Sequence, residues 1–122
     1  MKKILFILVA LSFCACKGEK DPLEVRKAEL EQENAAGMAV LNVARKHLAQ
    51  KDYTAARDSI ISLRKNHPHA IEARTLGLLT LDSIEMLAAR DSLAFATGED
   101  IERLSIKAQF YERKLVKDKA EQ

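Results

Sequence analysis

Apolar residues recur every three or four positions from residue 22 almost to the C-terminus, which is the spacing of one face of an α-helix. We expect the first helix to begin at Asp21-Pro22, because Asp is a good N-cap and Pro suits the first turn. Its opening half is mostly charged, with Leu23 and Leu30 as isolated apolar residues. Gly37 follows and permits either a bend or the close approach of another helix. The second half carries one apolar face, made of Val40, Val43, Ala44, His47 and Leu48.

Two further helices are expected before residue 97. Asp52 can serve as the N-cap of the second helix, which ends at Asn66-His67-Pro68. The apolar stripe of this helix is Tyr53, Ala56, Ile60 and Leu63. The third helix is expected to start at Pro68 and to run to about Ala96. Its polar side is marked by Glu72, Arg74, Asp82 and Glu85.

A fourth helix follows Thr97-Gly98, where Thr97 and Asp100 have the spacing of a capping box. Its seam is Ile101, Leu104, Ala108, Tyr111 and Leu115. At 1.5 Å per residue the third helix spans roughly 40 Å and the second roughly 20 Å, so the third should overhang the second by about half its length. We expect the fourth helix to fold back along that overhang, pairing Leu87 and Phe95 with Ile101, Leu104 and Ala108.

Composition agrees with an all-helical protein. The chain has 122 residues, 48% of them hydrophobic and 31% charged, with only four Gly and two Pro. A sheet would need turn residues and Val/Ile/Thr-rich strands that the sequence lacks. The predicted fold class is all-α, a small antiparallel bundle of four helices within residues 22–118. In this arrangement a helical hairpin is followed by a long hairpin at about 68–117.

The N-terminus has the pattern of a secretory signal. Met1-Lys2-Lys3 is basic, and Ile4 to Ala15 is an almost unbroken apolar run. A membrane-spanning helix needs about 20 such residues, so this run is too short to span and suits the apolar region of a signal peptide. We therefore assign residues 1–15 to a signal peptide.

The end of this run, Leu11-Ser12-Phe13-Cys14-Ala15-Cys16, resembles the lipobox of bacterial lipoproteins. The resemblance implies a diacylated thiol at the new N-terminus, which is commonly acylated too, and attachment to a membrane of the cell envelope. Cys16 is the preferred lipid-attachment residue because the small Ala15 precedes it; Cys14, preceded by bulky Phe13, is the alternative. Residues 16–21 form the tether. Lys17 rather than Asp after Cys16 implies transfer to the outer membrane, with its periplasmic or surface face undecided.

The charge balance changes once the signal is removed. The chain has 20 Lys and Arg against 18 Asp and Glu, and loss of Lys2 and Lys3 leaves 18 of each. No basic excess remains to neutralise nucleic-acid phosphates, so we expect no nucleic-acid partner.

Residues of about 37–70 resemble a tetratricopeptide repeat. The resemblance rests on a first helix, a turn at Asp52-Tyr53, a second helix and a terminal Pro, with the positions Val40, Val43, Ala44, Ala56, Ile60, Leu63 and Pro68. Small residues at the seam, Ala44 and Ala56, would allow close helix approach, whereas the aromatic residues usual on the first helix are absent. One repeat cannot bury both of its faces. Either a partner or second copy covers the face near residues 40–48 or the long hairpin, or the polar half of the first helix folds over it.

Candidate chemistry is sparse. His67 and His69 flank Pro68, with Glu72 one turn on, but structural metal sites need about four ligands, so we expect no metal site. Carboxylates lie near bases, as in Glu99 with Arg103 or Asp58 with Arg57, and favour a solvated surface. The basic cluster Arg113-Lys114, Lys117 and Lys119 is interpreted in the same way. We expect a non-enzymatic protein with no cofactor.

The sequence therefore predicts a lipid-anchored envelope protein that acts as a protein-binding helical adaptor. Its partner would be another envelope protein or a second copy of itself, and its acyl chains would bind the bilayer. The proposed contact residues are Val40, Val43, His47 and Phe95. The alternative is a structural or self-associating helical spacer lipoprotein without a dedicated ligand.

Overall fold

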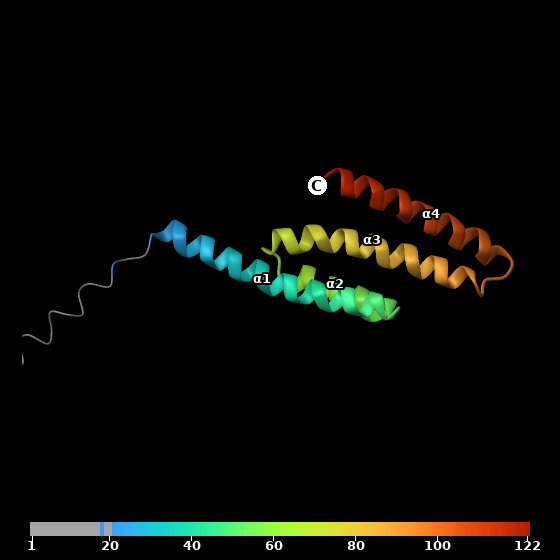
Figure 1. The fold of residues 1–122 in the computed structure, drawn as a ribbon, viewed down its shortest axis with the longest axis horizontal. Helices are drawn as coiled ribbons and strands as arrows, with labels where there is room; N and C mark the ends of the chain where they lie inside the picture. Colours follow the sequence, from blue (N-terminus) through green and yellow to red (C-terminus); the bar gives the residue numbers. More distant parts are fainter. Residues whose placement is uncertain (1–17, 19–20) are drawn as a thin grey trace, which may run out of the picture.

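The computed structural model describes Gly18 and residues 21–122, and these residues form four α-helices with no strand (Figure 1). The helices are α1 (Pro22–Ala49), α2 (Tyr53–Asn66), α3 (Ile71–Leu93) and α4 (Glu99–Ala120). The predicted all-α class and the number of helices are confirmed. The signal peptide, Cys14 and Cys16 lie outside the described residues, so their assignment stays a prediction.

Side-chain caps start the first two helices as expected. The carboxylate of Asp21 accepts a hydrogen bond from the Leu23 amide at 3.0 Å, and that of Asp52 accepts one from the Ala55 amide at 3.1 Å. Each carboxylate satisfies one of the amides that a helix leaves without an internal partner.

The start of α3 differs from the prediction because Pro68 and His69 form a turn and the helix begins at Ile71. Its N-cap, Ala70, has no side chain able to cap. The cap comes from another helix: Asn34 Oδ1 on α1 accepts a hydrogen bond from the Ala73 amide at 3.0 Å. The same Asn34 donates to Glu72 Oε2 at 3.1 Å.

The predicted capping box at the start of α4 is wrong, as is the extension of the third helix to residue 96. Helix α3 ends at Leu93, and Gly98 is the N-cap of α4, with φ of 60° and no side-chain cap bond. A positive φ favours glycine. Because Gly98 occupies the N-cap position, Thr97 lies one residue before it. Thr97 contributes only its carbonyl oxygen, which accepts from the Asp100 amide at 3.3 Å.

The core lies where α1, α2 and α3 meet. The stripe predicted for α2 is confirmed, with Ala56, Ile60 and Leu63 buried. On α1 the buried face is rotated from the predicted one, since Leu41 is fully buried and Val43 is 46% exposed. The buried set is Leu41, Ala44, Ala56, Ile60, Leu63, Ala70, Ala73 and Ile84.

Gly37 is a point of close approach. A Cβ atom at Gly37 would lie 2.6 Å from the Ala70 Cβ, 3.0 Å from the Ala73 Cβ and 3.2 Å from a methyl of Leu63. Real Cβ contacts essentially never occur below 3.0 Å. Because only glycine leaves this space, α1 can pack directly on the first turn of α3, and of the two roles open to Gly37 close approach is the one observed.

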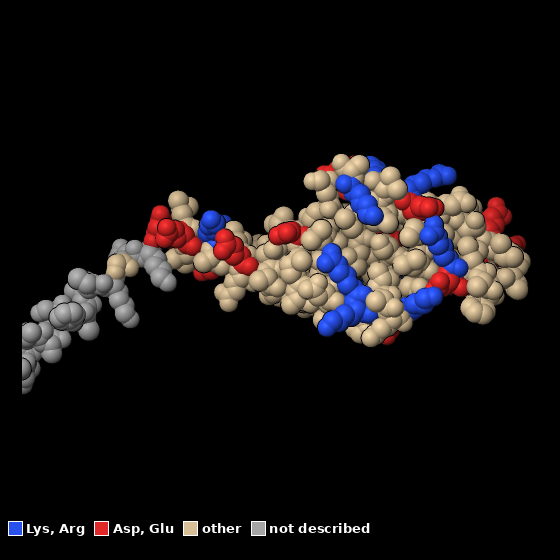
Figure 2. Space-filling model, in the orientation of Figure 1, with Lys and Arg blue, Asp and Glu red and all other residues tan. Residues whose placement is uncertain are grey.

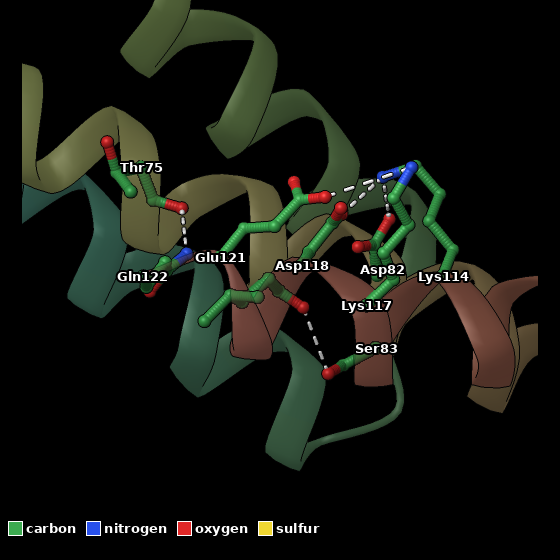
Figure 3. Close-up of polar contacts among 9 residues, drawn as sticks. Thr75, Asp82, Ser83, Lys114, Lys117, Asp118, Glu121 and Gln122 are labelled. Atoms are coloured by element: carbon green, nitrogen blue, oxygen red, sulfur yellow. Dashed lines mark hydrogen bonds and ion pairs between the residues drawn. The ribbon is translucent and has the colours of Figure 1, made fainter.

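Helix α4 packs against α3 as a long hairpin, and α3, with 23 residues against the 14 of α2, extends past the α1–α2 turn (Figure 1). Tyr53 at the start of α2 reaches Asp91 near the end of α3 through its side chain. Helix α4 returns beside α3 toward its first turns (Figure 1), where Gln122 Nε2 donates to the Thr75 carbonyl at 3.4 Å (Figure 3). Of the predicted pairing residues, Ala108 is buried, whereas Ile101 is 51% and Phe95 89% exposed.

The charged half of α1 does not fold over the bundle. Helix α1 is continuous from residue 22 to 49, and its first half projects beyond the other helices (Figure 1). We call residues 22–33 the projecting half. None of the described helices is long and apolar enough to cross a membrane.

Candidate functional site

Asp82 and Glu85, two carboxylates predicted to face solvent, instead lie between helices. The side chain of Asp82 is only 1% exposed, and its Oδ1 accepts a hydrogen bond from Lys114 Nζ at 2.8 Å (Figure 3). Lys114 Nζ also lies 2.6 Å from Asp118 Oδ2, so one ammonium serves two carboxylates. Lys114 is therefore no part of a solvated basic cluster. It joins α4 to α3.

The titration of this group follows from its burial. Burial raises the pKa of Asp82 above 3.8, and the nearby Asp118 raises it further, while Lys114 opposes both effects. Hydrogen bonds with Asp82 and Lys114 lower the pKa of Asp118. The bonds with Asp118 and Asp82 raise the pKa of Lys114, so the ammonium stays charged.

Glu85 forms a second link one turn further along α3. Its carboxylate, 12% exposed, accepts hydrogen bonds from the Arg57 guanidinium on α2 and pairs with Lys107 Nζ on α4 at 3.0 Å. Burial tends to raise the pKa of Glu85, but the bonds from Arg57 and Lys107 outweigh it and lower the pKa. Arg57 thus pairs across helices rather than with its neighbour Asp58. The predicted pairing of Arg103 with Glu99 also differs, since Arg103 pairs with Asp100 of its own helix at 2.9 Å.

Glu85 gives a pH prediction with a definite sign. Its pKa in the folded chain is below the ordinary value of 4.5, so its stabilising effect is present above that value and is lost as the pH falls through the folded pKa. In urea unfolding at a series of pH values, the natural chain should lose stability below about pH 4.5 more steeply than Glu85→Gln. The raised pKa of Asp82 acts in the opposite direction but is present in both chains. Parallel curves would contradict the prediction.

Tyr53 and Asp91 close the end of the bundle at the α1–α2 turn. The Tyr53 hydroxyl donates to Asp91 Oδ2, and Lys51 Nζ lies 3.4 Å from the same oxygen. Burial, the hydrogen bond to Asp91 and the Asp91 charge raise the pKa of Tyr53 to about 12. These groups hold the α1–α2 turn to α3.

The predicted contact residues belong to two different segments of the fold, α1 and the turn between α3 and α4. Val40, Val43 and His47 lie on α1, where Val43 is 46% exposed and Val40 and His47 are half-buried. Val40 packs against the core. Phe95, 89% exposed, lies in the turn between α3 and α4. These residues stay a prediction, with Val43 and Phe95 the more accessible ones.

The two histidines that flank Pro68 lie in different surroundings. His67 Nδ1 lies 3.6 Å from Glu33 Oε1 on α1, whereas His69 is exposed and lines a cleft beside the projecting half. Within residues 21–122, no three His, Cys, Asp or Glu side chains are grouped closely enough to hold a metal ion.

The projecting half carries a site that the sequence interpretation missed. Leu30, 46% exposed, continues the buried stripe of α1 at the same three- and four-residue spacing, and Leu23, 75% exposed, lies two turns earlier on the same line, with Arg26 and Lys27 on the turn between them. The whole stripe is Leu23, Leu30, Asn34, Gly37, Leu41, Ala44 and Leu48. Ile71 at the start of α3 is 67% exposed, and it lines with Leu30 an open cleft of about 420 Å³. We call Leu23, Leu30 and Ile71 the projecting face.

Acidic side chains outnumber basic ones on the projecting half, where Figure 2 shows both. The projecting half contains Glu24, Glu29, Glu31 and Glu33 against Arg26 and Lys27. Leu30 lines the clefts on both sides of α1, one with Glu29, Glu33 and Arg26 and the other with Glu31, Glu72 and Lys27, so each cleft has an excess of one carboxylate. Continuity of the stripe from Leu30 through Asn34 and Gly37 into the core was the available signal.

Comparison of the chain with models of known protein families, with curated protein sequences and with solved structures gave no match. The resemblances to a lipobox and to a tetratricopeptide repeat therefore rest on the residues alone.

Proposed function

We propose that this chain is a membrane-anchored lipoprotein of the bacterial cell envelope whose helical domain is a protein-binding adaptor. The basic start, the short apolar run and the small residue before Cys16 support the anchor. Acyl chains contribute about 0.8 kcal/mol per buried methylene, so two or three chains hold a protein firmly on a bilayer.

The projecting face carries the binding part of the proposal. It continues the core stripe of α1 past the end of the bundle, where no described helix covers it. Exposed apolar side chains that form one face, with charges around them, are typical of a contact surface. Because the surrounding charges are mainly glutamates, the partner segment should present apolar side chains flanked by Lys or Arg.

Site-specific cross-linking in intact cells tests this proposal. A photo-reactive residue at Leu30 should capture one discrete envelope protein, and the cross-link should map to an apolar segment with Lys or Arg beside it. Ala28, exposed two positions away on the far side of α1, is the matched control and should capture much less. Equal capture at both positions, or capture of many unrelated proteins, would overturn the binding site.

Two variants separate the alternatives within the proposal. Leu30→Asp should abolish partner recovery if the projecting face binds, whereas Val43→Asp should do so if the site predicted from sequence binds. Both side chains are 46% exposed, so neither change should unfold the chain.

In the same cells, Cys16→Ala should move the protein from the membrane to the soluble fraction, whereas Cys14→Ala should not.

A further inference from the structure

An open groove of about 290 Å³ lies between α2 and α3, and we call it the α2–α3 groove. Its apolar lining comes from Ile60 on α2 and from Ile71, Leu78 and Leu81 on α3. Ile71 and Leu78 are 67% and 40% exposed, so apolar surface is accessible along the groove. Its charged lining is Arg64 and Arg74, and no carboxylate lines it.

The two arginines lie at the same end of the groove. Arg64 is in the last turn of α2, and Arg74 is in the first turn of α3. Because only residues 67–70 connect the two helices, the last turn of α2 lies beside the first turn of α3. The two guanidinium groups therefore reach the groove from its opposite walls.

Both guanidinium groups keep donors for a ligand. Arg74 Nη1 donates to the Pro68 carbonyl at 2.7 Å, which holds the side chain in place, but Arg74 Nε is buried and meets no acceptor within the described residues. A buried donor without an acceptor is costly, and a carboxylate is the acceptor that a guanidinium binds most strongly. Within residues 21–122, neither Arg64 nor Arg74 forms an ion pair.

The carboxylates of the surrounding helices do not neutralise this groove. Asp58 on α2 is exposed and lies almost two turns before Arg64. The other carboxylates bond to partners of their own: Glu72 to Asn34, Glu85 to Arg57 and Lys107, Asp82 and Asp118 to Lys114, and Glu121 to Lys117. The positive charge of the groove is therefore left for a ligand.

We infer that the α2–α3 groove binds an acidic segment of a partner protein, with a carboxylate between Arg64 and Arg74. Ile71 and Leu78 lie one turn before and one turn after Arg74, so the segment should carry apolar side chains on both sides of its Asp or Glu. Pockets for small molecules enclose most of their ligand. The open shape of this groove therefore favours a protein segment.

This inference rests on the proposed function and adds a second contact to it. Ile71 lines both the α2–α3 groove and the cleft beside Leu30. One partner can therefore contact the projecting face and the groove together.

Cross-linking in intact cells tests the inference. A photo-reactive residue at Leu78 should capture the protein that Leu30 captures, and the cross-link should map to an Asp or Glu between apolar residues. Val116, 65% exposed on α4 and outside the groove, is the matched control and should capture much less. Capture of no protein at Leu78, capture of a segment without Asp or Glu, or labelling of phospholipid instead would overturn the inference.

A charge-reversal pair identifies the contact. A synthetic peptide copied from the cross-linked segment is titrated into the full chain in detergent. Arg64→Glu should raise the peptide dissociation constant about tenfold or more, because it removes a charge-assisted hydrogen bond. Lys65→Glu makes the same change one position along α2, outside the groove, and should change the constant by less than about twofold. Equal effects of the two substitutions would overturn the assigned contact.

Reversing the preference of the groove is the most specific test. The combined variant Arg64→Glu, Arg74→Gln should bind a peptide in which Lys replaces the Asp or Glu more tightly than the natural chain does. Circular dichroism confirms that this variant is folded. A folded variant that still prefers the acidic peptide would overturn the pairing.

The two sites fail separately. Capture at Leu30 without capture at Leu78 would remove the groove and leave the proposed function standing. Failure of capture at Leu30 would count against the projecting face, whatever the result at Leu78.

Discussion

Replacing Lys114 with Met is expected to lower the free energy of unfolding by about 3 kcal/mol. The substitution removes the ammonium that lies 2.8 Å from the Asp82 carboxylate, and that carboxylate is 1% exposed. Removal of one partner of a buried ion pair costs about 3–5 kcal/mol, because the other charge stays away from water. Lys114 itself is 33% exposed, which places the expected cost at the lower end. Urea unfolding followed by circular dichroism measures it.

The control for this prediction is Lys119→Met, which makes the same change at an exposed position of α4. The combined variant Asp82→Leu, Lys114→Met should recover most of the lost stability, since an apolar pair can replace a buried ion pair. The loss in Lys114→Met should also shrink as the pH falls and Asp82 binds a proton. Equal stability of the Lys114 and Lys119 variants would show that the Asp82 contact contributes nothing.

Replacing Gly37 with Val is expected to destabilise the chain by about 3 kcal/mol. The added Cβ would lie 2.6 Å and 3.0 Å from the Cβ atoms of Ala70 and Ala73, which are fixed to the backbone of the neighbouring segment. Helix α1 must therefore move away from α3, and such overpacking costs about 1–3 kcal/mol. The further methyl groups of Val add to the overlap and favour the upper end of that range. Thermal unfolding of the natural chain and of Gly37→Val measures this loss of stability.

Ala36→Val is the matched control, because Ala36 is exposed one position earlier on the same helix. Gly37→Ala should show a smaller loss, since alanine favours a helix over glycine by about 1 kcal/mol and offsets part of the overlap. Adding Ala70→Gly to Gly37→Ala should return most of the stability by reopening the space. A Gly37→Val chain as stable as the Ala36 variant would contradict the close approach.

Local signals predicted the parts of the fold that depend on neighbouring residues. The caps Asp21 and Asp52, and the stripe of α2, each need information from within one or two helical turns. The start of α3 could not be predicted in this way, because its cap, Asn34, lies 39 residues earlier in the chain. Periodicity also misplaced Val43: its spacing fits a helix face, but Gly37 and Leu41 determine which face packs.

The same limit applies to the candidate sites. Asp82 and Glu85 have the composition of a solvated helix face, and only the return of α4 along α3 buries them beside Lys114 and Lys107. Sequence spacing paired Arg57 with Asp58 and placed Lys114 in a solvated basic cluster, whereas in the fold Arg57 binds Glu85 and Lys114 binds Asp82. The projecting face was missed for a related reason, since Leu23 and Leu30 look isolated until the stripe is followed into the core.

The cap that Asn34 provides for α3 has a consequence for the order in which the domain assembles. Without this bond the first turn of α3 contains no side chain that caps it, whereas α1 and α2 each carry a cap of their own. The α3–α4 hairpin can form from contacts close in the chain, but its first turn gains its cap only when the middle of α1 docks. Amides around Ala73 should therefore open and close together with α1 rather than with the hairpin to which they are covalently joined.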